Sequence, residues 1–353
     1  MDNFTVCAEI STKDRYFTTL SLCIQGIILQ TRPPNELIIY DDGEQKDLRE
    51  VPLYNKLFHM LDRKGIKWEV RFGLRRGQIF NHQNMLDTCK STFIWRIDDD
   101  CVPEPTCLEN LLSSMKDDVG AVGGCVLFPD MVLSPPHFPL IDLEDIRFNS
   151  GNIQWFLFEG EKEVSQLYST FLFRVKAGRD SGGYCMELSP CGHREESIFS
   201  HKIKRIGWKL IVNPKAVTWH YAEPTGGIRT YSKHPDYWAN DEQIFQRKLS
   251  EWGVKMNQYK FIILDCGLGD TLMFLNILPE IKNKYGKDHK IVLAVCFPEV
   301  FQDEKDVTLI SIAEAKMICA NSSMDFDSFN VYKWAIGHGH SAHLIEAFRK
   351  LYL

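Results

Sequence analysis

The sequence predicts an α/β protein with a doubly wound, mixed but mostly parallel sheet, followed by a smaller Rossmann-like α/β domain. Stretches of strand length alternate with amphipathic stretches of helix length from residue 4 to about residue 125. This alternation is typical of parallel strands joined by crossover helices. A further strand, glycine-rich turn and helix begin near residue 257. Acidic side chains follow two of the expected strands, at the edge where such sheets bind ligands.

The first part of the chain has the clearest alternation. Short apolar runs bounded by turn residues indicate strands, whereas apolar residues spaced three and four apart indicate helices. Pro33 and Pro34 interrupt the chain before the second strand, and Asp41-Asp42-Gly43 ends that strand. We therefore expect strands at 4–10, 36–40, 68–72, 92–97 and 119–127, and helices at 16–30, 80–90 and 104–115.

The middle of the chain is less regular. Prolines at positions 129, 135, 136 and 139 indicate a long loop over 128–168, which we expect to line an acceptor site. Periodicity then returns, with a strand at 169–175, a helix at 194–206 and strand segments at 208–212 and 216–221. The segment 223–238, which contains Gly226, Gly227 and Arg229, is either a lid over phosphates or a surface linker.

A change of composition near residue 257 indicates a second domain. A helix at 236–252 leads to it, and strands at 259–264 and 290–297 follow, with helices at 271–285 and 341–352. The expected organisation is a first domain at 1–235, a helical linker at 236–256 and a small α/β domain at 257–353.

Composition argues against several classes of protein. The 353 residues are 44% hydrophobic and 25% charged, as in ordinary globular proteins, and the formal net charge of −6 argues against nucleic-acid binding. The amino terminus lacks a signal-peptide pattern and no uncharged run approaches membrane-spanning length, so we expect a cytoplasmic protein without a transmembrane segment. Eleven scattered cysteines without a Cys-X-X-Cys motif are expected to be reduced thiols.

Asp98, Asp99 and Asp100 directly follow the strand expected at 92–97. Neighbouring carboxylates repel one another, and a divalent cation held by hard oxygen ligands relieves that repulsion. Side chains alternate along an extended segment, so Asp98 and Asp100 are expected to point together while Asp99 points away. Mn²⁺ or Mg²⁺ with a nucleoside diphosphate as co-ligand suits such a pair. A solvated turn is the alternative interpretation of an isolated acidic triplet.

Two further acidic pairs lie at the ends of expected elements. Asp41 and Asp42 end the second strand, where they form either a plain turn or part of a nucleotide site, since an Asp there can accept hydrogen bonds from a base or ribose. Glu195 and Glu196 lie near the start of the helix at 194–206. Either the helix dipole favours acidic residues at this position, or one of the two acts as a general base.

These acidic groups belong to a longer series of segments. In chain order the series comprises Ile10 to Arg15, Gln30 to Gly43, Gly77 to Asn84, Asp98 to Asp100, Glu195-Glu196 and Gly207 to His220. With this series, Met1 to about Tyr221 is similar to family 2 inverting glycosyltransferases of the GT-A fold. In order, the six segments resemble that family's opening strand and turn, its second-strand signature, its sugar-nucleotide loop, its metal motif, its Glu-Asp pair and its closing segment.

The resemblance implies roles for individual residues. Mn²⁺ or Mg²⁺ would be held by Asp98 and Asp100. His220 would be a further metal ligand or a phosphate contact, and a structural histidine is the alternative interpretation. Glu196 would take the proton from an acceptor hydroxyl. Glu195 is the alternative base, because Glu196 stands where the family usually has Asp. Lys13-Asp14 stands where Tyr-Asn is common. The residues implied in donor-nucleotide binding are Thr12, Asp14, Arg15, Asp41, Asp42, Gly77, Asn81, Asp98 and Asp99.

The implied activity is metal-dependent transfer of a hexose, with inversion, from a nucleoside diphosphate sugar to a hydroxyl group of a glycan or related acceptor. UDP is the family's commonest nucleotide. Two other functions stay open. A nucleotidyltransferase also uses paired aspartates with Mg²⁺, but it usually opens with a glycine-rich phosphate loop that residues 10–15 lack. The second is a catalytically silent sugar-nucleotide-binding or scaffold protein.

The carboxy-terminal domain carries a resemblance of its own. Gly267-Leu268-Gly269-Asp270-Thr271 through Ile281 resembles the opening of the amino-terminal half of GT-B glycosyltransferases of the heptosyltransferase type. In that family the other half binds most of the sugar nucleotide. We therefore expect this domain to serve acceptor binding, docking or dimerisation, the last giving a homo-oligomer.

Overall fold

The computed structural model describes residues 4–44, 47–129, 153–231, 233–254, 258–321, 326–338 and 343–353. The chain forms two compact units. The first comprises the described residues up to 129 and from 154 to 254, and the second comprises Ile153 and the described residues from 258 onward. Most of the long loop expected at 128–168 therefore lies outside the described residues.

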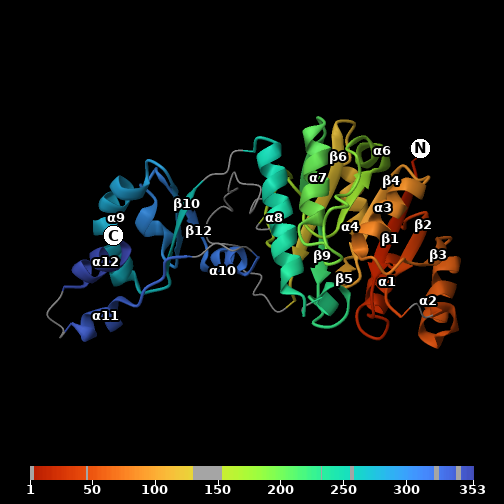
Figure 1. Ribbon diagram of the computed structural model, residues 1–353, viewed down its shortest axis with the longest axis horizontal. Helices are drawn as coiled ribbons and strands as arrows, with labels where there is room; N and C mark the ends of the chain where they lie inside the picture. The colour runs from red at the N-terminus through yellow and green to blue at the C-terminus, as the bar shows by residue number, and fades with distance from the viewer. Residues whose placement is uncertain are drawn as a thin grey trace. The chain divides into compact units, whose positions relative to one another are not determined.

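Nine strands of the described residues form one mixed sheet in the first unit (Figure 1). The strands β1, β2, β3 and β4 are parallel to one another, whereas β8 runs antiparallel to both β4 and β6. The spatial order is β3(Lys67–Phe72), β2(Glu36–Asp41), β1(Val6–Thr12), β4(Phe93–Asp98), β8(Phe171–Arg174), β6(Val119–Leu127), β9(Lys209–His220) and β5(Cys101–Pro103), with β7(Lys162–Glu163) also paired to β9.

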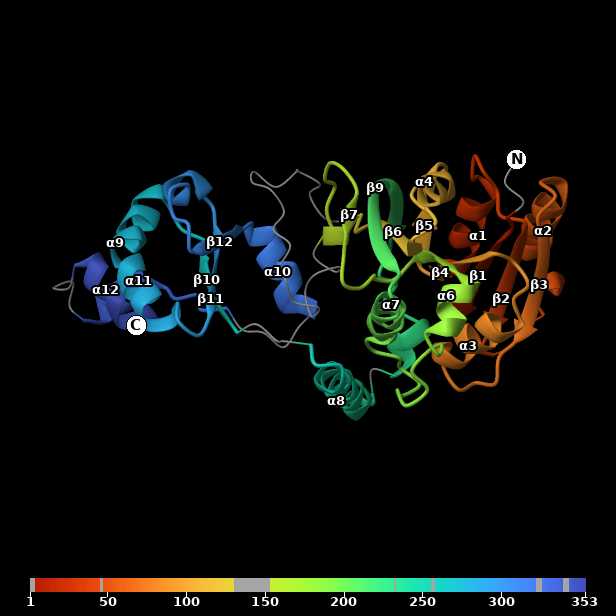
Figure 2. The same cartoon turned by 90° about the horizontal axis from the view of Figure 1, so that it is seen from above.

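Helices cover both faces of this sheet (Figure 2). One face packs against α1(Leu20–Ile28), α2(Pro52–Arg63) and α4(Cys107–Ser113), and the other against α3(Gln78–Thr88), α6(Val175–Asp180) and α7(Glu195–Arg205). Successive side chains of β1 point to opposite faces of the sheet. Val6, Ala8 and Ile10 enter the apolar core with α1. Glu9 and Ser11 point the other way and bond to α3.

The order of the inner strands reverses between β1 and β4. Both strands are parallel and adjacent, yet β2 lies on the far side of β1. The register pairs Ser11 with Asp98 and Thr12 with Asp41, so the carboxyl ends of β1, β2 and β4 meet at one edge. In open α/β sheets this switch point is where ligands bind.

The structure differs from the expectations about several elements of the first unit. The helix α2 lies between β2 and β3, where none was predicted. The strand expected at 169–175 ends at Arg174, since Val175 begins α6. The edge strand β5 was not predicted, and the two segments expected at 208–212 and 216–221 are the single strand β9. A register shift after Gly124 lets β9 continue past Pro214, which has no backbone N–H to donate.

A long helix, α8(Pro235–Glu251), completes the first unit together with the short turns η1(Leu48–Glu50) and η2(Gly227–Tyr231). Its buried side chains are Asp241, Ile244, Phe245 and Leu249. None of the 11 cysteines, all of which lie in the described ranges, forms a disulfide, and eight of them are buried.

The second unit is a small three-layer α/β structure. Its parallel sheet has the order β10(Tyr259–Leu264), β11(Lys290–Val295), β12(Val307–Ile310). One face packs against α9(Leu268–Tyr285) and α12(Leu344–Tyr352), and the other against α10(Ile312–Asn321). The elements η3(Pro298–Phe301) and α11(Val331–Gly337) complete it. No helix within the described ranges is long and apolar enough to cross a membrane.

The close approach of β6 and β9 at the register shift gives the first prediction. A Cβ atom on Gly124 would lie 1.9 Å from the backbone oxygen of Ala216, which cannot move without the strand. Gly124→Ala is therefore expected to lower the free energy of unfolding by about 1–3 kcal/mol, the usual cost of overpacking. Denaturant unfolding followed by tryptophan fluorescence measures the change.

Gly269→Ala is the control, because its new methyl group meets no atom within 4 Å. It is expected to leave stability unchanged or to raise it by up to about 1 kcal/mol through helix propensity. Equal stabilities of Gly124→Ala and the wild type would contradict the close approach.

Candidate functional site

The acidic triplet forms a turn at the switch point of the sheet. The strand β4 ends at Asp98, and residues 99 and 100 lie in the turn that leads to β5. The expectation that Asp99 points away from Asp100 is therefore wrong, since side chains alternate only along an extended backbone. The Nη1 atom of Arg15 lies 2.5 Å from Asp99 Oδ1 and 2.9 Å from Asp100 Oδ2. One buried guanidinium thus neutralises both carboxylates.

Asp99 faces the end of β1. Its Oδ2 atom accepts a hydrogen bond of 2.7 Å from the Thr12 hydroxyl. Burial raises the pKa of Asp99 to about 6 against the opposing charge of Arg15, while the same charge helps to keep Asp100 ionised. Thr12, Arg15 and Asp99, all predicted to bind the donor, therefore form one contact group with each other.

Asp100 faces His220 at the end of β9. The pairing of β5 with β9 places Cys101 opposite His220, and His220 Nε2 lies 3.3 Å from Asp100 Oδ1. Burial alone would raise the pKa of Asp100, but the hydrogen bond and charge of His220 and the charge of Arg15 lower it to about 2. The same contact raises the pKa of His220 in spite of its burial.

This pair fits a hard divalent cation. Ligand atoms of Asp100, Cys101 and His220 lie within 4.8 Å of one another. Burial raises the pKa of the Cys101 thiol well above its usual range, so the oxygen and imidazole ligands suited to Mn²⁺ come from Asp100 and His220. The buried Nδ1 atom of His220 has no hydrogen-bond partner among the described residues.

Asp98 lies beside this group and has different partners. Its carboxylate accepts a hydrogen bond of 2.6 Å from the Ser169 hydroxyl and lies 3.2 Å from Arg96 Nη2. Its side chain keeps 28% of its surface exposed, in contrast to the buried Asp99 and Asp100. Asp98, which ends β4, is thus the most solvent-exposed of the three aspartates.

Arg96 connects the acidic turn to the start of α7. It lies inside β4, with 2% of its side chain exposed, and its Nη1 atom lies 2.6 Å from Oε1 of the fully buried Glu195. A buried carboxylate needs such a partner, because an unpaired charge away from water is costly. Arg96 was not among the predicted site residues, although a lone cation in an apolar strand indicates a buried partner of opposite charge.

The contacts of α7 distinguish the two glutamates. Glu195 is paired with Arg96 and is inaccessible, whereas Glu196 is partly exposed. Burial, together with the charge of Glu195, raises the pKa of Glu196 to about 7, and Arg96 opposes this only in part. A carboxyl group of this kind is matched to proton transfer near neutral pH.

The loop after β3 is held by Asp42. Its carboxylate accepts hydrogen bonds from the backbone N–H groups of Arg75, at 2.6 Å, and Gly77, at 2.8 Å. Gly77 has a φ of 95°, a conformation that favours glycine, and it begins α3. Asn81 in α3 donates a hydrogen bond to Ser11 Oγ at the end of β1.

The turn after β2 is closed by short contacts. Asp41 Oδ1 accepts hydrogen bonds from the Tyr16 hydroxyl, at 2.5 Å, and from Gly43 N, at 2.9 Å, and burial raises the pKa of Asp41. Asp14, which has a φ of 58°, accepts a hydrogen bond from Glu44 N across the same edge. The residues predicted to bind a donor therefore gather at the carboxyl ends of β1, β2 and β4, some of them through contacts with each other.

Residues 223–227 lie against Arg15. The guanidinium donates hydrogen bonds to the carbonyl groups of Thr225, at 3.0 Å, and Glu223, at 3.2 Å. Gly227 N donates to Lys13 O at 2.7 Å, next to Gly226 with its φ of 69°. This segment, expected to be a lid or a linker, is thus fixed to the same arginine that holds the acidic turn.

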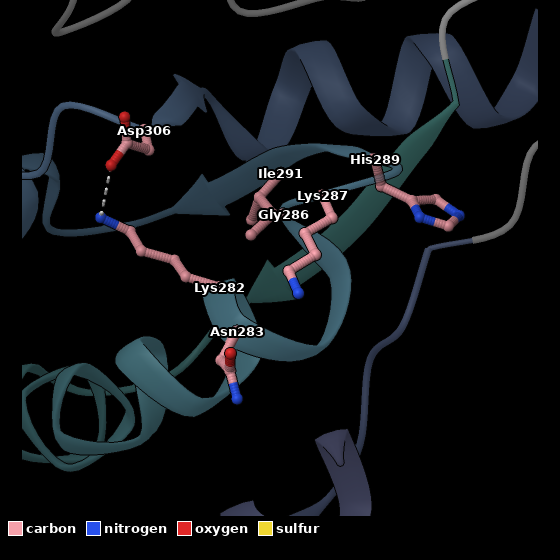
Figure 3. A pocket seen from close by; sticks show the side chains of 7 residues that line it. All are labelled: Lys282, Asn283, Gly286, Lys287, His289, Ile291 and Asp306. Atoms are coloured by element: carbon pink, nitrogen blue, oxygen red, sulfur yellow. Dashed lines mark ion pairs between the residues drawn. The ribbon is translucent and has the colours of Figure 1, made fainter.

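The second unit contains a separate cavity of about 340 Å³ (Figure 3). Its lining cation Lys282 is paired with Glu304 at 2.6 Å and Asp306 at 3.8 Å, so its charge is already compensated. The cavity is next to the carboxyl end of α9, where the helix dipole disfavours anions. It is lined by Lys282, Asn283, Gly286, Lys287, His289, Ile291 and Asp306.

Comparison with protein families finds a match in the first unit. Residues 10–173 match the family described as Glycosyl transferase family 2. The matched segment contains the acidic turn and the loop held by Asp42, but neither α7 nor the second unit. The likeness of residues 267–281 to a GT-B half therefore stays a prediction. A comparison with curated proteins found no match.

Several solved structures are similar to the chain at low identity. The mannosyltransferase PcManGT from Pyrobaculum calidifontis, in complex with GDP-Man and Mn²⁺, is 17% identical with a TM-score of 0.45, covering 63% of this chain and 58% of that one. GalNAc-T7 with UDP, GalNAc and Mn²⁺ is 16% identical with a TM-score of 0.47, covering 63% and 44%. TarS 1-349 from S. aureus in complex with UDP-GlcNAc is 12% identical with a TM-score of 0.49, covering 90% and 79%. The chain thus spans less than two thirds of the first two proteins.

The raised pKa of Glu196 predicts a pH-dependent stability. An ordinary Glu has a pKa near 4.5, so between about pH 4.5 and pH 7 the folded protein holds a proton that the unfolded chain has lost. Wild-type stability should therefore fall as the pH rises through this window. Glu196→Gln removes the charge and is expected to be more stable than the wild type at pH 8 by on the order of 1–3 kcal/mol.

The two proteins should differ little at pH 4.5, where Glu196 is protonated, and denaturant unfolding at both pH values measures the difference. Glu159→Gln, at an exposed position, is the control and should change stability by less than about 0.5 kcal/mol at either pH. A stabilisation by Glu196→Gln that is the same at both pH values would argue against a carboxyl group whose pKa is raised in the folded protein.

Proposed function

We propose that the chain, in which residues 10–173 match the family described as Glycosyl transferase family 2, moves a sugar from a nucleoside diphosphate sugar to an acceptor hydroxyl group with inversion. The observation that carries the proposal is the arrangement around Arg96. This buried cation pairs with Asp98 in the acidic turn and with Glu195 in α7. A donor-binding edge and a carboxyl group of raised pKa are thereby held on the same side of the sheet.

Glu196 is the proposed general base. In the reaction the oxygen of the acceptor hydroxyl forms a bond to the anomeric carbon, and Glu196 takes the hydroxyl proton. The bond between the anomeric carbon and the diphosphate oxygen breaks, and the nucleoside diphosphate leaves with the electron pair. Attack from the face opposite the leaving group inverts the configuration. Glu195 is unsuited to this role because it is fully buried and paired with Arg96.

Asp100 and His220 are the proposed protein ligands for Mn²⁺ or Mg²⁺, with Asp98 as the further carboxylate that the sequence suggested. When bound, the cation would offset the negative charge that develops on the departing diphosphate. Arg15 and Arg229 add positive charge close to Asp100. The turn is therefore surrounded by the cationic groups that a leaving diphosphate requires.

The loop held by Asp42 and the turn at Asp41 are the proposed nucleotide site. Asp42 uses its carboxylate to fix the backbone of Arg75 and Gly77, so it would shape the loop rather than touch the nucleotide. A uridine nucleotide is proposed on the family's common preference. For the second unit we retain acceptor binding, docking or dimerisation as the proposed roles.

The test of the activity is a screen of nucleoside diphosphate sugars by thermal shift and donor hydrolysis, with Mn²⁺ and with a chelator. Metal-dependent stabilisation together with consumption of one donor would support a transferase. A binding or scaffold protein would be stabilised by the donor without consuming it. A nucleotidyltransferase would instead release pyrophosphate from a nucleoside triphosphate.

Replacement of the base gives a kinetic prediction. Glu196→Gln is expected to lower the turnover number by about 100- to 10,000-fold, the usual contribution of general-base catalysis, while donor binding is retained. Wild-type turnover should rise with pH through about 7 as Glu196 loses its proton. Glu195→Gln is the comparison, and its main defect should be instability. Near-wild-type turnover of Glu196→Gln, with turnover lost in folded Glu195→Gln, would reverse the assignment.

Removal of the metal ligands gives a second prediction. Asp100→Asn and His220→Ala should each weaken Mn²⁺ binding by at least about 10-fold, because even groups outside the ligand shell contribute that much. Electron paramagnetic resonance of free Mn²⁺ measures this without any turnover. Cys101→Ser is the control and should bind Mn²⁺ as the wild type does. Unchanged Mn²⁺ binding in both ligand variants would contradict the proposed site.

A further inference from the structure

Asp241 is a buried carboxylate that the proposed reaction does not use. It lies in the middle of α8 and has no exposed surface. Its Oδ1 atom accepts a hydrogen bond of 2.7 Å from Ser189 N. Its Oδ2 atom accepts bonds of 2.8 Å from Ser189 Oγ and 3.0 Å from His193 N. The carboxylate thus binds both ends of the segment 189–193.

The same segment leads directly into the helix that carries the proposed base. Glu195 N donates a hydrogen bond to Gly192 O, and Ile198 N donates to Arg194 O in the first turn of α7. Arg194 adopts a φ of 68°, which is strained for a residue with a side chain and needs support from its surroundings. A displacement of residues 189–193 would therefore change where Glu196 lies.

The segment also contacts the donor loop. A Cβ atom on Gly77 would lie 2.4 Å from the backbone oxygen of Pro190, and one on Gly192 would lie 3.1 Å from Gln78 Nε2. Gly77 is the residue whose backbone N–H is held by Asp42. Residues 189–193 are therefore packed between the loop after β3 and the start of α7.

A second acidic residue of α8 supports the attachment. Glu242 lies 2.9 Å from Arg194 Nε and 3.3 Å from His193 Nε2, and it accepts a hydrogen bond of 2.7 Å from Gln246 Nε2. Glu242 therefore holds the side chains next to α7, whereas Asp241 holds the backbone. Two adjacent carboxylates of one helix thus bind two consecutive parts of the segment.

We propose that Asp241 is a positioning residue that fixes segment 189–193 between the donor loop and α7 and so sets the distance between the bound donor and Glu196. The inference rests on the proposed function, since it assigns the segment a catalytic consequence. Asp241 itself touches neither donor nor acceptor in this scheme. Its effect passes through the backbone of Ser189 and His193.

Asp241→Asn and Asp241→Ala test the proposal. The Asn variant keeps one acceptor oxygen but presents an amide group where His193 N and Ser189 Oγ donate, whereas the Ala variant removes all three bonds. The turnover number of correctly folded enzyme is expected to fall about 10-fold and about 100-fold respectively, with a smaller change in KM for the donor, because misplacement of a reacting group chiefly affects the chemical step. The acid limb of the pH profile should also move, since the surroundings of Glu196 change.

Amide hydrogen exchange provides a readout that does not depend on turnover. The amides of Ser189 and His193 should exchange at least about 10-fold faster in both variants, because they lose a buried acceptor. Glu251→Gln is the matched control, since Glu251 lies on the same helix but is exposed and pairs only with Arg247 and Lys248 among the described residues. It should leave exchange, turnover and the pH profile unchanged.

Unchanged exchange at Ser189 and His193 would overturn the proposal, whatever the turnover. Faster exchange with wild-type turnover and an unmoved pH profile would also overturn it, because the contact would then be merely structural. A wild-type enzyme that consumes no donor would instead reject the proposed function, and with it the catalytic meaning of the contact. The two failures are therefore distinguishable.

Discussion

The buried ion pair between Arg96 and Glu195 is the interaction on which the site depends. Arg96 lies inside β4 and Glu195 at the start of α7, and neither is accessible to water. Removing one partner of such a pair typically costs about 3–5 kcal/mol, because the remaining charge is left without compensation. The pair thus fixes the start of α7 against the sheet. It also leaves Glu196 as the one of the two glutamates that retains access to solvent.

Charge compensation also explains how three consecutive aspartates are accommodated. Each carboxylate of the turn has a cationic partner, and the partners come from different parts of the chain. Asp98 lies near Arg96, Asp99 near Arg15, and Asp100 near both Arg15 and His220. These contacts relieve the mutual repulsion of the three carboxylates. They connect the ends of β1, β4 and β9 at one edge of the sheet.

The two faces of the sheet have different tasks. The face covered by α1, α2 and α4 is an apolar core, whereas the face covered by α3 and α7 carries buried polar pairs such as Glu9 with His82. Residues 189–193 close this polar face, where they contact the start of α3 and continue into α7. The helix α8 holds them there through Asp241. These buried polar contacts therefore lie on the face of the sheet opposite the apolar core of α1, α2 and α4.

The sequence by itself determined most strands and helices of the first unit, the opening strand, helix and strand of the second unit and its last helix, the acidic triplet at the end of β4 and the position of Glu195 and Glu196 at the start of α7. These features depend on local periodicity and on turn residues, which one chain displays directly. It missed α2, although the buried residues of that helix are spaced three and four apart. It also missed α6, β5 and β7 in the first unit and β12, α10 and α11 in the second, most of which are short. Only the tertiary structure separated Glu195 from Glu196, ended the alternation of side chains at Asp98 and attached α8 to segment 189–193. Those outcomes were decided by partners distant in sequence, because the free energy of a buried carboxylate depends on which charge or hydrogen-bond donor the fold brings beside it.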